Sequence, residues 1–253
     1  MRIIKSIIVA FSMYSRIPMP QFAWKDEDMK YMLCFFPWVG AVTGFCLFLW
    51  GVLSGKLLIG QTAYILIATA IPLLITGGFH VDGFMDTMDA FHSYQPKERK
   101  LEIMKDSHIG AFSVISLALL GMLWLAAISE INRAGAFGVM CAGFMLSRVL
   151  SGISVVTFPS AKKEGLLYLF ADKAQRDKVK LALYAQGILC AGFMLFCSLK
   201  GGILAIAAAL AVFWYYYRKT KKELGGITGD TAGYFVVICE TAILAAEAVV
   251  SIL

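Results

Sequence analysis

Long apolar runs separated by short polar segments are the dominant pattern along this chain. A helix of about 20 residues crosses the hydrocarbon core of a bilayer, and lipid offers no partner for backbone polar groups, so such runs are helical. The pattern predicts an all-α, polytopic helical membrane protein with about seven transmembrane helices, and 1–253 as a single integral membrane domain. The predicted spans are 31–54, 60–79, 110–131, 134–158, 180–199, 201–217 and 231–253, with a tight turn at Lys200-Gly201-Gly202.

The first 16 residues have apolar side chains on only one face of a predicted helix. That face holds Ile3, Ile4, Ile7, Ile8 and Phe11. Arg2 and Lys5 fall on the other face. The segment is short for a span and lacks a small-residue cleavage site, so we expect an interfacial amphipathic helix over 1–16. Pro18 and Pro20 then enforce an extended turn.

Composition agrees with a membrane protein and argues against a nucleic-acid partner. The chain is 59% hydrophobic and 16% charged, with a mean hydropathy of +0.74, whereas soluble domains are about 45–50% apolar and about 25% charged. The net charge of +6 comes from basic residues in the polar segments between spans. Basic residues in this position orient a protein in the membrane, so we expect the lipid bilayer and no nucleic acid as a partner.

The distribution of basic residues also predicts the orientation. If the N-terminus lies inside, 19 of the 23 Lys and Arg residues fall on the cytoplasmic side. Only Lys56, Arg133 and Lys200 fall outside, and Arg148 lies within a span. The positive-inside rule then predicts an N-in, C-out protein of the cell membrane. The segments 80–109, 159–180 and 218–230 would all open to the cytoplasm, so we expect a cytoplasm-facing active site.

Three aspartates in segment 80–109 are the leading candidates for chemistry. Asp82, Asp86 and Asp89 are spaced D-x3-D-x2-D, which on a helix confines them to an arc of about 60°. Like charges on one helix face repel, and a divalent cation with oxygen ligands compensates for them. Apolar neighbours such as Phe84 and Phe91 favour packing in the bundle over a solvated helix, so we expect metal ligation.

Other residues of the same segment could act beside that acidic face. His80 follows Gly77-Gly78, and a catalytic base and a structural histidine are equally compatible with its position. Lys105 could bind phosphate, and Asp106 could ligate a metal or a hydroxyl. The alternative for Lys105 and Asp106 is an ordinary cytoplasmic loop, whose basic residues only orient the protein in the membrane.

Two further sites lie outside the acidic segment. Arg148, within a span, is costly there and would either pair with Glu240 in the last span or bind a phosphate. The loop before the last span carries three glycines, whose backbone N–H groups can approach a phosphate closely. Those glycines are Gly225, Gly226 and Gly229, and Asp230 follows as a further carboxylate. Acids for a metal, basic residues and a glycine-rich loop together indicate phosphoryl transfer.

At these residues the sequence resembles the cobalamin synthase family, the adenosylcobinamide-GDP ribazoletransferases. The resemblance covers most of the chain, and two of its motifs are long and specific. The motifs are SRIPMP (15–20), GGFHVDGFMDTMDAF (77–91), RKLEIMKDSHIGAFSV (99–114), LSR (146–148), KEGLLYLF (163–170) and GGITGDTAGYFVVICE (225–240).

The resemblance implies a reaction that composition and spacing do not show. In this family α-ribazole, or its 5′-phosphate, attacks the diphosphate of adenosylcobinamide-GDP, GMP leaves, and Mg2+ is required. On these residues it implies that Asp82, Asp86 and Asp89 bind Mg2+. It also implies that Asp106 and Asp230 are secondary metal ligands or candidate bases, and that Lys105 and Arg148 bind phosphate. Together with the candidates from the residues themselves, the expected catalytic residues are His80, Asp106 and Asp230, and the expected substrate- and phosphate-binding residues are Lys105, Arg148, Gly225, Gly226, Gly229 and Glu240.

Two alternative functions remain open at this point. The sequence is also compatible with a homo-oligomer. The CDP-alcohol phosphotransferases use a similar mechanism, although their aspartate motif is absent here. A secondary transporter could line an ion path with buried charged groups, but the acids cluster at one face and no inverted repeat is visible.

Overall fold

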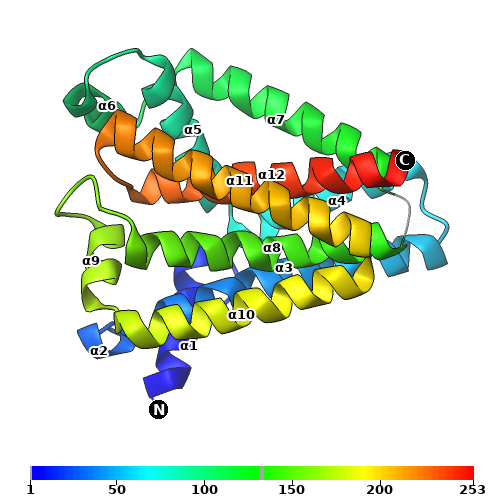
Figure 1. Ribbon diagram of the computed structural model, residues 1–253, viewed down its shortest axis with the longest axis horizontal. Helices are drawn as coiled ribbons and strands as arrows, with labels where there is room; N and C mark the ends of the chain where they lie inside the picture. The colour runs from blue at the N-terminus through cyan, green and yellow to red at the C-terminus, as the bar shows by residue number, and fades with distance from the viewer. Residues whose placement is uncertain (1, 132–133) are drawn as a thin grey trace.

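The long helices of the protein run side by side along its longest axis (Figure 1). The computed structural model describes residues 2–131 and 134–253. The long helices are α3 (Met32–Lys56), α7 (Ala111–Glu130), α8 (Ala134–Thr157), α10 (Arg176–Cys197), α11 (Leu199–Leu224) and α12 (Gly229–Ile252). All six are long and apolar enough to cross a membrane, since about 20 helical residues span roughly 30 Å.

The helix α4 (Gln61–Thr76) corresponds to the predicted span 60–79, and the chain then changes direction sharply. Gly77 and Gly78 both adopt left-handed backbone conformations, with φ of +67° and +79°, which glycine tolerates at no steric cost. The next helix, α5 (Phe79–His92), is bent by 93° from α4. Because α5 contacts the N-cap of α7 and the first turn of α12, it lies across the end of the bundle.

The short helices gather with α5 at one end of the bundle, and the C-terminus lies at the other (Figure 1). They are α1 (Arg2–Tyr14), α2 (Asp26–Met29), α6 (Lys97–Ile103) and α9 (Leu166–Lys173). In α1, Val9 and Ala10 are buried against the bundle, whereas Ile3 and Ile4 are more than 60% exposed. An outward apolar face is what the interfacial prediction for 1–16 requires.

The helices α8 and α12 form the centre of the bundle, and α7 and α10 lie at its periphery. Val149 and Phe235 are buried in the centre, whereas Leu123 of α7 and Ile188 of α10 are largely exposed. Large apolar side chains that point outward are expected where lipid, not water, surrounds the helices. The all-α polytopic fold is therefore confirmed, and the side that faces the cytoplasm stays a prediction.

Two details of the expected segmentation were wrong. The turn between the fifth and sixth spans is at Ser198, between the end of α10 and the start of α11. The hydroxyl of Ser198 accepts the N–H of Gly201 and so caps α11. Gly201 and Gly202 instead lie in the first turn of that helix. The helix α11 also extends to Leu224, well beyond the predicted end at 217. Arg133, counted on the outer side, lies outside the described residues.

Candidate active site

The three predicted aspartates all lie on α5, as their spacing indicated. Asp82 is exposed, and Asp86 and Asp89 are half-buried. The opposite side of α5 is buried through Phe84 and Phe91, so the helix is packed against the bundle through its apolar face. The prediction of one acidic helix face is therefore confirmed, and its metal-binding role stays a prediction.

Asp89 also supports the first turn of α7. Gly110, at the N-cap of that helix, has no side chain to accept the free backbone N–H groups. The two carboxylate oxygens of Asp89 accept the N–H of Gly110 at 2.8 Å and of Ser113 at 2.9 Å. A Cβ on Gly110 would lie 2.4 Å from Asp89 Oδ1, so glycine at 110 permits this contact. Asp89 therefore joins the acidic helix to the next span.

A close crossing of α5 and α12 brings Asp230 to the same acidic face. A Cβ on Gly83 would lie 2.7 Å from the carbonyl oxygen of Asp230, so the two backbones touch because residue 83 has no side chain. Partial burial raises the pKa of Asp86 to about 6, and the charges of Asp82, Asp230 and Asp89 add to this effect. The four carboxylates therefore repel one another at one place.

Asp82 and Asp230 line a cleft of about 460 Å³ together with basic side chains. We call it the carboxylate–lysine cleft, and its charged lining residues are Asp82, Lys105, Lys162, Glu164 and Asp230. Its floor includes Thr228 and Gly229 at the start of α12. The hydroxyl of Thr228 caps that helix by accepting the N–H of Thr231 at 3.2 Å. The positive end of the α12 dipole thus faces the cleft, which favours anions.

Lys162 and Glu164 were not recognised from the sequence. Lys162 lies in the loop between α8 and α9, and its Nζ donates to the carbonyl oxygen of Leu101 at 3.3 Å. Partial burial and the nearby charge of Lys105 lower the pKa of Lys162. Glu164 forms an ion pair with Lys105 at 2.8 Å, which raises the pKa of Lys105. Glu164 lies in the KEGLLYLF motif (163–170), but no spacing pattern assigns a role to it or to Lys162, because loop packing brings both residues to the cleft.

The three predicted loop glycines have different surroundings. Gly225 ends α11 with a φ of +73°. Gly226 lies against the preceding loop, where a Cβ would come within 2.4 Å of the carbonyl oxygen of Pro159. Ile227 donates to that oxygen at 2.9 Å, and this contact holds the two loops together beside the cleft. Gly229 opens onto the cleft, which makes it the loop glycine best placed for a phosphate.

Asp106 lies on the exposed loop after α6. Its carboxylate accepts the backbone N–H of His108 at 3.0 Å and contacts Nδ1 of the same residue at 2.6 Å. These contacts lower the pKa of Asp106. It does not line the carboxylate–lysine cleft.

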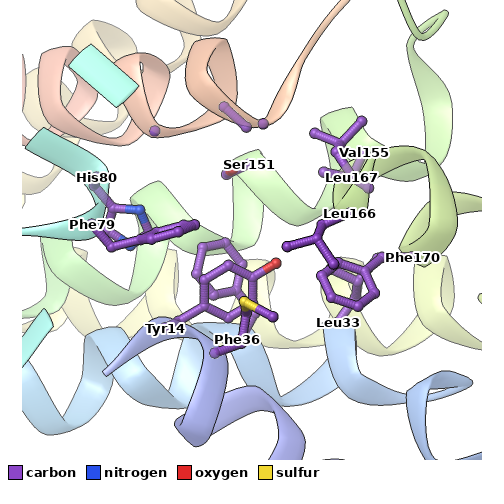
Figure 2. A pocket seen from close by; sticks show the side chains of 14 residues that line it. Tyr14, Leu33, Phe36, Phe79, His80, Ser151, Val155, Leu166, Leu167 and Phe170 are labelled. Atoms are coloured by element: carbon purple, nitrogen blue, oxygen red, sulfur yellow. The ribbon is translucent and has the colours of Figure 1, made fainter. Parts of the chain in front are cut away.

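His80 faces away from the carboxylates, into a cavity lined mainly by aromatic and aliphatic side chains (Figure 2). The ring packs near Tyr14, Phe36 and Phe79. Its buried Nε2 has no hydrogen-bond partner among the described residues. The cavity volume of about 60 Å³ is well below the roughly 150 Å³ of an apolar cavity that binds benzene. It is therefore too small for a substrate ring.

Arg148 and Glu240 form an ion pair inside the bundle, which was one of the two alternatives for Arg148. The Arg148 side chain is 1% exposed and also donates to the carbonyl oxygen of Phe144 at 2.8 Å. Glu240 accepts a further hydrogen bond from Ser147 at 3.1 Å. Pairing explains why both charges are tolerated there, and a phosphate-binding role for either residue stays a prediction.

The carboxylates fit a hard divalent cation by their chemistry. Oxygen donors are the ligands that Mg2+ prefers. A cation would relieve the mutual repulsion of these carboxylates, which adds to the effect of burial on the pKa of Asp86. As the side chains stand, no group of three or more His, Cys, Asp or Glu residues in the described ranges forms a complete metal site. The carboxylates therefore suit magnesium by their chemistry, but their side chains do not converge on one point as metal ligands do.

Fold and cleft together define a polytopic membrane protein with an acidic and basic cleft at one end of its helices. A family model described as cobalamin-5-phosphate synthase matches residues 6–248. The chain belongs to this family and is a transferase of cobalamin biosynthesis. The sequence resemblance is thus confirmed.

Several relatives carry the name adenosylcobinamide-GDP ribazoletransferase. The protein of Lachnoclostridium phytofermentans is 39% identical over 99% of this chain and 97% of its own length. A protein of Clostridium perfringens is 33% identical over 93% of this chain and 94% of its own. One of Fusobacterium nucleatum is 30% identical over 90% and 91%. No solved structure matches the chain.

Proposed function

We propose that this protein is an adenosylcobinamide-GDP ribazoletransferase whose active site is the carboxylate–lysine cleft. A ribose hydroxyl of α-ribazole, or of its 5′-phosphate, would attack the cobinamide-linked phosphorus of the diphosphate. A new P–O bond forms, the bridging P–O bond to GMP breaks, and GMP leaves with the electron pair. The observation that carries this proposal is the meeting of Asp82 and Asp230 with Lys105 and Lys162 in one cleft.

The residues of the cleft would have two roles: some would bind the negatively charged diphosphate, and one would accept a proton. Lys105, Lys162 and the start of α12 would bind the diphosphate oxygens, because cations and helix N-termini stabilise phosphate. Asp230 would accept the proton of the attacking hydroxyl, since it lines the cleft and is half-buried. A positioned carboxylate in this role contributes roughly 10²–10⁴-fold to the rate.

Asp82 and Asp86 would hold Mg2+, and Asp89 would contribute the lone pairs that its contacts with α7 leave free. When bound, Mg2+ would neutralise the diphosphate and make phosphorus more electrophilic. His80 and Asp106 are weaker candidates for the base, because His80 faces the aromatic cavity and Asp106 is engaged by His108.

The decisive assay measures GMP release by the purified protein in detergent with adenosylcobinamide-GDP, α-ribazole and Mg2+. We expect GMP and a cobalamin product in equal amounts, and a loss of at least about 100-fold in Asp82→Asn or Asp86→Asn. Asp177→Asn, in the first turn of α10, is the matched control and should retain turnover. Wild-type activity in both cleft variants would refute the site. A transporter would release no GMP, and a CDP-alcohol enzyme would instead release CMP from a CDP-alcohol.

We further propose that the cleft faces the cytoplasm, because the basic residues concentrate at that end. A reporter that folds only in the cytoplasm, fused after Leu253, should then stay dark, whereas the same reporter at the N-terminus should fluoresce. The reverse pattern would overturn this orientation.

A further inference from the structure

A second groove, on the other side of Asp82, contains an unpaired arginine. It has a volume of about 820 Å³ and lies between the end of α1, the last turn of α4 and the start of α5. We call it the Arg16 groove. Arg16 is exposed there, and no carboxylate of the described residues forms an ion pair with it. Its guanidinium is therefore available to a ligand.

Two backbone features hold Arg16 in place. Its N–H donates to the carbonyl oxygen of Ile75 at 2.7 Å, which ties the segment after α1 to the end of α4. Its side chain lies directly over Gly77, where a Cβ would come within 2.5 Å of Nε. Because Gly77 also has a positive φ, glycine is needed there both for the turn and for the path of the arginine. The backbone of Arg16 and the start of its side chain are thus positioned by the fold.

The Arg16 groove and the carboxylate–lysine cleft meet at two shared residues. Asp82 and Phe79 line both. The cleft has two lysines and the start of α12 for a diphosphate, and the groove offers one guanidinium beside apolar side chains such as Leu73 and Leu74. A reaction that joins two molecules needs both of them at the same carboxylate. The geometry provides one opening for each.

We propose that the Arg16 groove binds the acceptor nucleoside and that Arg16 binds the phosphomonoester of its phosphorylated form. This inference rests on the proposed function and extends it to the choice between phosphorylated and free acceptor. A guanidinium matches a phosphate with two parallel hydrogen bonds, and the apolar wall suits an uncharged ring. Arg16 is then a specificity-determining residue and takes no part in the proton transfer.

The test compares both acceptors with the same enzyme preparations in a neutral detergent. Wild type, Arg16→Gln and Arg16→Lys are assayed for GMP release with α-ribazole and with α-ribazole 5′-phosphate, at fixed adenosylcobinamide-GDP and Mg2+. Arg99→Gln is the matched control, because Arg99 is a surface arginine at the same end and forms an ion pair with Glu102. Thermal stabilisation by each acceptor alone gives a second reading, independent of turnover.

We expect Arg16→Gln to raise KM for the phosphorylated acceptor roughly 10- to 100-fold, as loss of a charge-assisted pair does. KM for the free acceptor should change less than about threefold, with kcat retained in both cases. Arg16→Lys should recover part of the loss, because it keeps the charge but not the paired hydrogen bonds. Arg99→Gln should behave as wild type.

Three results would overturn the inference while wild-type GMP release still supports the proposed function. Equal losses of GMP release with both acceptors would mean that Arg16 supports the fold or the reaction as a whole and does not bind the phosphomonoester. Unchanged kinetics with the phosphorylated acceptor would exclude a contact. A headgroup phosphate is the other source of the same chemistry. An Arg16-dependent stabilisation by vesicles containing phosphatidic acid, without one by the phosphorylated acceptor, would assign the groove to lipid.

Discussion

The contact between Gly83 and Asp230 makes a quantitative prediction about catalysis. In Gly83→Ala the new Cβ would lie 2.7 Å from the carbonyl oxygen of Asp230 and 2.9 Å from its Cα. Both atoms are backbone, so no side chain can rotate away. Ordinary contacts begin at 3.4 Å, and α5 and α12 must therefore separate locally by about 0.7 Å.

This separation should affect turnover more than stability. Overpacking costs about 1–3 kcal/mol, and the higher helix propensity of alanine offsets up to about 1 kcal/mol of it. A misplacement of about 1 Å at a reacting centre can lower the rate about 100-fold. Because Asp82 and Asp86 would move relative to Asp230, we expect kcat to fall roughly 10- to 100-fold.

The assay is GMP release at saturating substrates, together with the apparent Tm of the protein in detergent. Gly192→Ala is the matched control, because it makes the same change within α10 and the added Cβ has no atom within 4 Å apart from its chain neighbours and the backbone of its own helix. That variant should keep wild-type turnover. If Gly83→Ala retained wild-type kcat, the carboxylates of α5 and α12 would not act together, and the proposed division of roles would fail.

Three further predictions concern the charged residues. In metal-free protein, burial and neighbouring acids raise the pKa of Asp86 from 3.8 to about 6, so the folded state binds the extra proton and stability falls as pH rises from about 4 to 6. Asp86→Asn should remove that part of the decline, which melting curves in EDTA at pH 4.5 and 7.5 would show. Arg148→Ala should lower stability by about 3–5 kcal/mol, because it leaves Glu240 buried and unpaired. The double variant Arg148→Met with Glu240→Leu should recover both the yield of folded protein and its turnover. Recovered yield without turnover would instead indicate a phosphate-binding role for the pair. Lys162→Gln should raise KM for adenosylcobinamide-GDP about tenfold, and an unchanged KM would remove Lys162 from the diphosphate site.

Features governed by local periodicity could be predicted from the sequence. Apolar runs give the spans, because a helix in lipid needs about 20 apolar residues whatever its neighbours are. The i, i+4, i+7 spacing places Asp82, Asp86 and Asp89 on one face for the same local reason. The alternative pairing of Arg148 with Glu240 was also accessible, since two lone charges within spans seek each other.

Features that depend on contacts between distant segments could not be predicted. Lys162 reaches the cleft only because the loop after α8 packs beside the start of α12. The side chains that surround His80 also come from distant segments, among them Tyr14 of α1 and Phe36 of α3. The role of Asp89 in capping α7 depends on the missing side chain of Gly110, 21 positions along the chain.

If the acidic face binds Mg2+ as proposed, the capping contact of Asp89 would make the first turn of α7 a reporter of cation binding. The same carboxylate holds the amides of Gly110 and Ser113 and stands among the acids that would attract Mg2+. A cation that draws on this carboxylate must alter how tightly it retains those two protons. Hydrogen–deuterium exchange at the first turn of α7 should therefore change with magnesium in the absence of any substrate, so that ion occupancy can be followed separately from turnover.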